Sequence, residues 1–167
     1  GWLVWLGAYS GARLEELCQL ARDNIRQVRG RWVLDINSRE GRRLKNDFSE
    51  RLVPVHPVLI ETGFIEWAKK GSGPRVFMSF ELRKSVNGST YGGPASASFG
   101  KFLDKLKLTD RALKFHSLRH TFIEALRNAE APYSVELALV GHQDKISRVH
   151  GNYGGSAGLD VLAKYVE

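Results

Sequence analysis

The sequence is poor in cysteine and has no long apolar run. It holds one cysteine, Cys18, so no disulfide can form within one chain and a reducing compartment suits it. Its most apolar stretch, residues 1–8, is too short to span a bilayer and lacks the basic leader of a signal peptide. We interpret this stretch as a buried helix. Because the chain opens inside it, we expect the sequence to be a piece of a longer protein.

Acidic residues are fewer than basic ones. The 25 Lys and Arg against 18 Asp and Glu give a formal net charge of +7 and a pI of about 9.7. This balance suits a polyanionic partner such as nucleic acid, although many basic domains bind none. Hydrophobic residues make up 43% of the chain, and neither an internal repeat nor a low-complexity tract interrupts it. We therefore expect residues 1–167 to form a single globular domain.

Hydrophobic periodicity predicts an α+β fold that is mainly helical, with a small three-stranded antiparallel sheet. We expect strands at 25–28, 32–36 and 51–55, the last one short or at an edge because it contains Pro54. Segment 71–93 is rich in Gly, Ser and Pro and predicts a loop around a short strand at 76–77. Helices are expected at 13–22, 58–70, 95–106, 117–129, 134–140, 145–149 and 159–166.

Segment 115–120 is the strongest local motif, with the pattern His-x-x-Arg-His. Ser117 is a candidate cap for the helix that follows. The apolar face of that helix is expected to hold Leu118, Phe122, Ala125, Leu126 and Ala129. His116, Arg119 and His120 would then lie on the opposite side near the helix start, where exposed N–H groups favour an anion. A solvated helix surface is the commoner explanation of a bare His-x-x-Arg.

Two further basic residues lie in distinctive settings. Glu16 follows Arg13 by one helical turn and can orient it, so that the guanidinium forks two N–H donors onto a phosphate. An ordinary surface ion pair is the alternative. Lys45 lies on the loop before the third strand, where a lysine can reach a leaving oxygen and protonate it. A solvated basic turn is the alternative there.

A histidine and a tyrosine follow near the end of the chain. His142 comes directly after Gly141, and Tyr153 lies shortly beyond it, next to glycine. Glycine neighbours leave the tyrosine hydroxyl accessible, but a phenol with a pKa of ~10 needs nearby cations to attack at neutral pH. A lone tyrosine in a glycine-rich loop is more often a packing residue.

The order of these motifs resembles the catalytic domain of the tyrosine recombinases, the phage integrase family. The order is Gly-x-Arg-x-x-Glu, Lys with Arg-Leu-Val-Pro, His-x-x-Arg-His, Gly-His and Tyr-Gly, and it covers residues 5–165. The resemblance implies the DNA breaking–rejoining fold and a site-specific recombinase, or integrase. Such an enzyme cuts and rejoins DNA through a 3′-phosphotyrosine to integrate or excise a mobile element such as a phage, without metal or cofactor.

By this resemblance, Arg13 and Arg119 clamp the scissile phosphate and His142 is a third donor. Glu16 orients Arg13, and His120 supports the site from its own motif.

The proton-transfer roles and the nucleophile are implied in the same way. His116 resembles the general acid/base partner, Lys45 the general acid for the departing 5′ oxygen, and Tyr153 the nucleophile. The interval before Tyr153 is longer than in compact members, which leaves Tyr165 as a competitor. Tyr165 lies in an amphipathic terminal helix, where we expect it to pack.

The resemblance also implies partners. Double-stranded DNA is the substrate, the full-length protein forms a homo-tetramer on it, and DNA-bending or directionality factors can assist. A cytoplasmic, nucleoid-associated location and no membrane contact are expected. The family's N-terminal core-binding domain is absent from this chain, so we expect weak specific binding, and the short tail after Tyr153 resembles tails that dock on a neighbouring protomer.

Three alternatives stay open at this stage. The first is a recombinase-like DNA-binding module without turnover. The second is a type IB topoisomerase, which shares the chemistry but relaxes supercoils. The third is a metal enzyme built on His116, His120, His142 and His150, which the missing His-Glu-x-x-His pattern and the intervening arginine disfavour.

Overall fold

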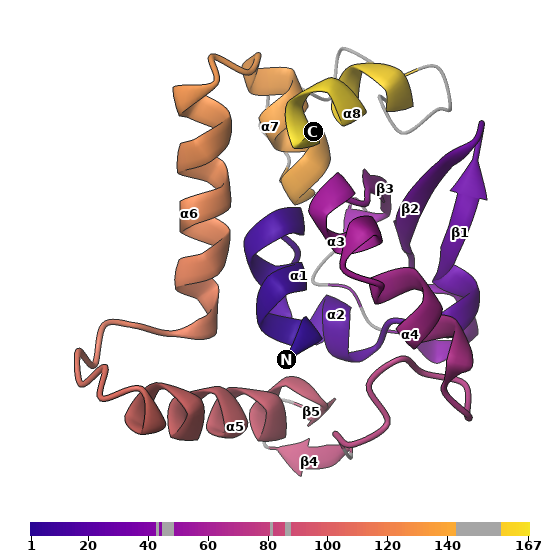
Figure 1. Ribbon diagram of the computed structural model, residues 1–167. Helices are drawn as coiled ribbons and strands as arrows, with labels where there is room; N and C mark the ends of the chain where they lie inside the picture. Colours follow the sequence, from indigo (N-terminus) through magenta and orange to yellow (C-terminus); the bar gives the residue numbers. More distant parts are fainter. Residues whose placement is uncertain (43, 45–48, 81, 86–87, 143–157) are drawn as a thin grey trace.

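A computed structural model of the chain describes residues 1–42, 44, 49–80, 82–85, 88–142 and 158–167. A small sheet lies at one edge of the molecule with helices packed beside it, and the long helix α6 stands at the opposite side (Figure 1). The α-helices are α1 Trp2–Ser10, α2 Leu14–Cys18, α3 Pro57–Glu61, α4 Phe64–Lys70, α5 Gly92–Lys105, α6 Phe115–Asn128, α7 Tyr133–Val140 and α8 Leu159–Val166. Two short 3-10 helices are η1 Arg22–Asn24 and η2 Arg39–Gly41.

The main sheet has the predicted strands. β1 (Ile25–Val28), β2 (Arg31–Ile36) and β3 (Arg51–Pro54) are antiparallel in the order β1-β2-β3. The third strand is short and lies at an edge, as its proline predicted, because a residue without an N–H cannot donate to a second neighbouring strand.

A second hairpin was not predicted. β4 (Arg83–Ser85) pairs with β5 (Gly88–Thr90) inside the segment expected to be a loop. The predicted strand at 76–77 is wrong, since Arg75 alone forms a bridge there, to Ala21. The hairpin strands are polar and lack the apolar alternation by which a strand is recognised.

Two predicted helices are shorter than expected. The helix expected at 13–22 ends at Cys18, and the chain then turns into η1. The helix expected at 58–70 is divided into α3 and α4 at Gly63, whose φ of 87° is incompatible with a continuous helix. Periodicity alone does not distinguish such breaks, because the apolar positions keep helical spacing on both sides. The helix expected at 145–149 lies outside the described residues.

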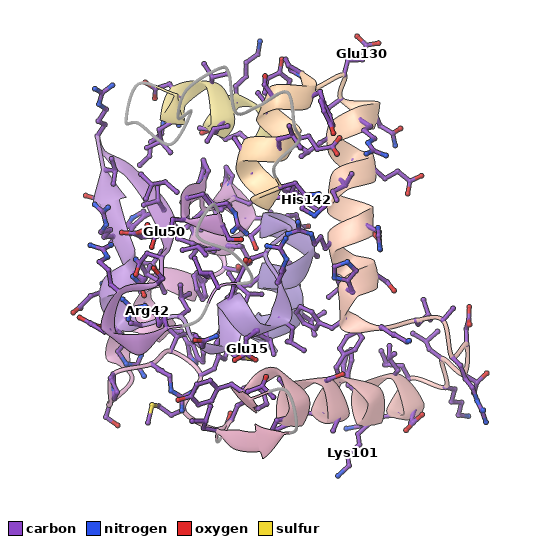
Figure 2. All side chains as sticks on the ribbon, turned by 180° about the vertical axis from the view of Figure 1, so that it is seen from behind. Glu15, Arg42, Glu50, Lys101, Glu130 and His142 are labelled. Carbon is purple, nitrogen blue, oxygen red and sulfur yellow. The ribbon has the colours of Figure 1, made fainter. Side chains whose placement is uncertain are left out.

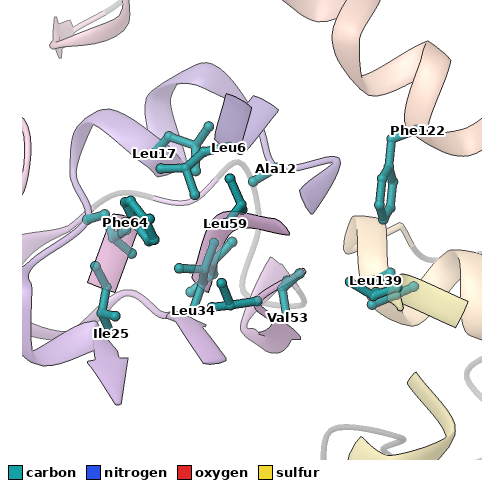
Figure 3. Close-up of a cluster of buried hydrophobic side chains, with 14 of the residues drawn as sticks. Leu6, Ala12, Leu17, Ile25, Leu34, Val53, Leu59, Phe64, Phe122 and Leu139 are labelled. Atoms are coloured by element: carbon teal, nitrogen blue, oxygen red, sulfur yellow. The ribbon is translucent and has the colours of Figure 1, made fainter. Parts of the chain in front are cut away.

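One hydrophobic core joins the helices to the sheet. Leu6 and Leu17 from α1 and α2 meet Leu34 and Val53 from the sheet, and all four are fully buried (Figure 3). Burying a side chain of this size contributes about 1.5–3 kcal/mol. α1 is buried on one side only, since Trp5 is 44% exposed, so the prediction of a buried helix holds for one face.

Helix α1 packs closely against α6. A Cβ added to Gly7 would lie 2.6 Å from Cζ of Phe115, so the Phe115 ring of α6 packs directly against the backbone of α1 there. α5 packs against α2, and α8 packs against α7 and β3 (Figure 1). These contacts bring the α1–α2 turn, the α6 helix and the carboxyl end of α7 to one place. Among the described residues, none of the helices combines the length and hydropathy needed to cross a membrane.

Candidate active site

Arg119 is the most enclosed of the predicted site residues that the structure describes. Its exposed fraction is 2%, and it shares the buried side of α6 with Phe115, Phe122 and Leu126. The expectation that Arg119 lies opposite the apolar face was therefore wrong. Positions four before and three after a residue lie on its own side of a helix, and both of these are phenylalanines here. Ala125, which was assigned to the apolar face, is exposed.

Backbone carbonyls hold the Arg119 guanidinium. Nη1 donates to the carbonyl oxygen of Gly11 at 2.6 Å, and Nη2 donates to that of Val140 at 2.7 Å. Burial, together with the charges of Arg13 and Arg51, lowers the pKa of Arg119 to about 10. The side chain therefore stays cationic at neutral pH.

Arg13 is held by Glu16, as predicted from their spacing. Nη1 of Arg13 lies 2.9 Å from Oε1 of Glu16, whose Oε2 accepts a second bond from the Arg13 backbone N–H at 2.8 Å. The Glu16 side chain is 2% exposed, so this is not an ordinary surface pair. Nη2 of Arg13 also approaches the carbonyl oxygen of Gly141 at 3.5 Å.

Arg51 also binds Glu16 and so joins Arg13 and Arg119 in this site, although the sequence motifs gave it no role. It lies at the start of β3, and its Nη2 is 2.8 Å from Oε2 of Glu16, with both side chains buried. Its Nε donates to the carbonyl oxygen of Leu139 at 2.8 Å. Burial raises the pKa of Glu16, but Arg51 and Arg13 outweigh this and lower it below its usual value. The signal in the sequence was an arginine opening a predicted strand in Arg-Leu-Val-Pro.

Three arginines thus bind three successive carbonyl groups at the end of α7. Arg51 binds Leu139, Arg119 binds Val140, and Arg13 approaches Gly141. The carboxyl end of a helix carries partial negative charge, because its last carbonyls have no partners inside the helix. This end of α7 therefore offsets part of the repulsion among the gathered guanidinium groups.

His116 and His120 lie on the exposed side of α6, with ring centroids 4.9 Å apart in an edge-to-face arrangement. Partial burial lowers the pKa of His116, and the charges of His120, Arg119, Arg13 and His142 lower it further. This environment favours the neutral imidazole of His116, which is able to accept a proton.

Ser117 does not cap α6, because the helix begins earlier than predicted. Lys114 is the cap residue, and the Ser117 hydroxyl oxygen accepts a bond from the Lys114 backbone N–H at 3.1 Å. The serine therefore supports the helix start from one turn inside it.

His142 comes after Gly141, the residue that caps the end of α7, and is exposed, with its backbone N–H bonded to the carbonyl oxygen of Leu137 at 3.2 Å. Figure 2 shows it in the region between α7 and α6. Lys45 and Tyr153 lie outside the described residues. Tyr165 is in α8, where it is partly buried and packed against the core, as expected.

Cys18 takes no part in this site. Its side chain is fully buried, and burial, with the charge of Glu15, raises the pKa of the thiol to about 12. Within the described part of the chain, no group of three or more His, Cys, Asp or Glu side chains is arranged to hold a metal ion.

Comparison with known proteins gives a family and a fold. The sequence model of the phage integrase family matches residues 3–154. The Tn1549 transposon integrase, solved in complex with circular intermediate DNA, is 21% identical with a TM-score of 0.56, over 96% of this chain and 58% of that one. An arginine-to-lysine variant of that integrase, also solved with a circular intermediate DNA, is 16% identical with a TM-score of 0.58, over 96% and 57%. This chain thus spans somewhat more than half the length of both, and no curated protein sequence matches it.

Proposed function

The chain belongs to the phage integrase family, and we propose that residues 1–167 are the catalytic domain of a tyrosine-type site-specific DNA recombinase. In this proposal the domain cuts and rejoins DNA strands through a 3′-phosphotyrosine, to integrate or excise a mobile element.

The convergence of Arg13 and Arg119 at the carboxyl end of α7 carries this proposal. A phosphodiester is anionic, and its pentacoordinate transition state concentrates more charge on the phosphoryl oxygens. Two guanidinium groups fixed by Glu16 and by backbone carbonyls are prepared to neutralise that charge before the substrate arrives. The net charge of +7 adds attraction for the DNA backbone.

The proposed reaction conserves the bond energy of the DNA backbone. The Tyr153 phenol oxygen attacks the phosphorus atom, and its proton passes to the neutral imidazole of His116. The bond to the 5′ oxygen breaks as Lys45 gives that oxygen a proton, and His142 helps to hold the phosphate. The products are a 3′-phosphotyrosine and a free 5′ hydroxyl. The reverse steps on another strand rejoin the DNA, so neither a nucleotide nor a metal is needed.

Duplex DNA is the proposed substrate, and the DNA bound to the Tn1549 integrase in its solved complexes supports this choice. A homo-tetramer on DNA, accessory bending or directionality factors and a nucleoid location are proposed for the full-length protein. His120 is proposed to support the site from its exposed position beside His116.

Covalent trapping tests the function. The chain is incubated with supercoiled plasmid, or with a nicked suicide duplex carrying the cognate site, in the presence of a chelator. A denaturing gel then detects a protein–DNA adduct. The adduct is expected for the wild type and for Tyr165→Phe, and it should disappear in Tyr153→Phe. An adduct that survives Tyr153→Phe would move the nucleophile elsewhere, and DNA binding without any adduct would favour the binding module.

A further inference from the structure

Arg51 is a buried arginine that the proposed chemistry does not use. It donates to Glu16, to Leu139 and, at 2.7 Å, to the carbonyl oxygen of Ser49. We infer that Arg51 is a positioning residue, which fixes the Arg13 guanidinium and the end of α7 relative to one another for phosphate binding. This inference rests on the proposed function, in that it takes the arginine cluster as the phosphate site.

Two arginines share the carboxylate of Glu16. Arg51 binds both of its oxygens, with Nη2 2.8 Å from Oε2 and Nη1 3.3 Å from Oε1. Arg13 binds the same two oxygens, through Nη1 at 2.9 Å and its backbone N–H at 2.8 Å. A carboxylate held at both oxygens cannot rotate, so the direction of the Arg13 side chain is set by Arg51.

Arg51 also holds the carboxyl end of α7. The bond from Arg51 to Leu139 lies one residue before the carbonyl that Arg119 binds, and the chain reaches His142 soon after. Arg51 also fills the space against Gly141, where an added Cβ would lie 2.7 Å from its Nη1. One side chain therefore ties the segment before His142 to the helix that begins after Arg13.

The stability of the fold alone does not explain why a charged arginine is buried at position 51. Burying an ion pair costs desolvation, and apolar side chains of similar volume often serve a core as well or better. A second pair in the chain serves as a comparison: Arg127 binds both oxygens of Glu136 at 2.9 Å, but the Arg127 side chain is 65% exposed. The Arg51 pair differs in that its partners are themselves bonded to Arg13 and to α7.

Inorganic phosphate is the probe for the test, because its binding does not depend on DNA cleavage. The NMR signals of the His116 and His142 imidazoles are followed during a phosphate titration at constant ionic strength. Arg51→Lys keeps the charge but loses the fork, and it is expected to weaken phosphate binding about tenfold, the loss of one charge-assisted hydrogen bond. Arg127→Met is expected to bind phosphate as the wild type does.

A double-mutant cycle separates positioning from general weakening of the fold. If Arg51 acts by holding Arg13 and the end of α7 relative to one another, then Arg51→Lys should cost clearly less phosphate affinity in an Arg13→Ala background than in the wild type. Additive losses, unchanged affinity in Arg51→Lys, or no phosphate binding by the wild type would each overturn the inference.

A further variant covers the case in which Arg51→Lys does not fold. Glu16→Gln/Arg51→Met removes both buried charges together and so leaves neither unpaired. It should bind phosphate as weakly as Arg13→Ala does, and wild-type affinity in this variant would also overturn the inference. A chain whose phosphate affinity depends on Arg51 as expected, but whose wild type forms no DNA adduct, would refute the proposed function alone.

Discussion

The Arg119 guanidinium donates a hydrogen bond of 2.6 Å to the carbonyl oxygen of Gly11, at the left-handed residue that ends α1. Its second bond goes to another carbonyl, that of Val140, and none of the ion pairs found within the described residues includes Arg119. Neutral partners hold the side chain in place without cancelling its charge. The positive charge of Arg119 is therefore available for an anionic ligand.

Arg119→Lys should lower both stability and adduct formation. An ammonium group on a shorter, unforked side chain cannot reach both carbonyls, so one bond to a charged donor is lost. We expect the free energy of unfolding to fall by about 1.5–3 kcal/mol in urea denaturation. Arg127→Lys, two turns along the same helix and exposed, should change it by no more than about 1 kcal/mol. Equal effects of the two substitutions would contradict this account of Arg119.

Gly11→Ala should destabilise the chain more than an ordinary glycine replacement. The residue has φ 60°, and an added Cβ would lie 2.4 Å from Cδ1 of Phe122. We expect a loss of about 2–5 kcal/mol, the sum of a left-handed backbone and an overpacked core. Gly30→Ala is the control. Gly30 also has a left-handed φ, 78°, but no atom lies within 4 Å of a Cβ added there, so the free energy of unfolding should fall by only about 1–2 kcal/mol. Thermal or urea unfolding of both variants measures the difference.

His116 should titrate below 6.5, the usual value for a histidine. Removing a neighbouring cation by Arg13→Ala should raise its pKa, which an NMR titration of the imidazole would detect. Because the pKa is lowered in the folded chain, the contribution of His116 to stability is full above 6.5 and is lost as the pH falls through the folded pKa. In His116→Gln, the free energy of unfolding should therefore decrease less as the pH falls below 6.5 than it does in the wild type.

His56 is the control for His116, because burial lowers the pKa of His56 as well. His56→Gln should likewise reduce the dependence of stability on pH below 6.5. It should leave the pH profile of adduct formation unchanged, whereas His116→Gln should alter that profile. An adduct profile that responds equally to both variants would remove His116 from the proposed proton transfer.

Cys18 should react with thiol reagents only when the chain opens. The thiol is fully buried and its pKa is raised to about 12, so almost no thiolate is present at pH 8. Labelling by a disulfide reagent should be slow in buffer and complete within the mixing time in denaturant. Rapid stoichiometric labelling of the native chain would show that α2 is not packed as described.

The sheet and most helices were predictable because their residues repeat with a clear period. Trp32, Leu34 and Ile36 alternate along β2, and the strand has the predicted end. The break at Gly63 was not predictable, because a left-handed φ leaves the apolar spacing around it unchanged. The second hairpin was missed because its strands are polar.

The sequence predicted which residues gather at the site better than it predicted how their side chains are placed. Arg13 and Glu16 were paired correctly from spacing, since a helix places such residues side by side. Arg119 was assigned to the wrong face because a charged residue was assumed to face solvent, whereas the backbone carbonyls that satisfy it belong to residues far away in the sequence. Arg51 was missed for the same reason, because its partners come from α2 and α7.

The bonds of Arg119 also determine when the arginine cluster can exist during biosynthesis. The side chain joins Gly11, near the start of the chain, to Val140, near its end. A nascent chain that stops before α7 has neither the carbonyls that gather the three arginines nor His142. A product truncated before α7 therefore cannot assemble the cluster of Arg13, Arg51 and Arg119.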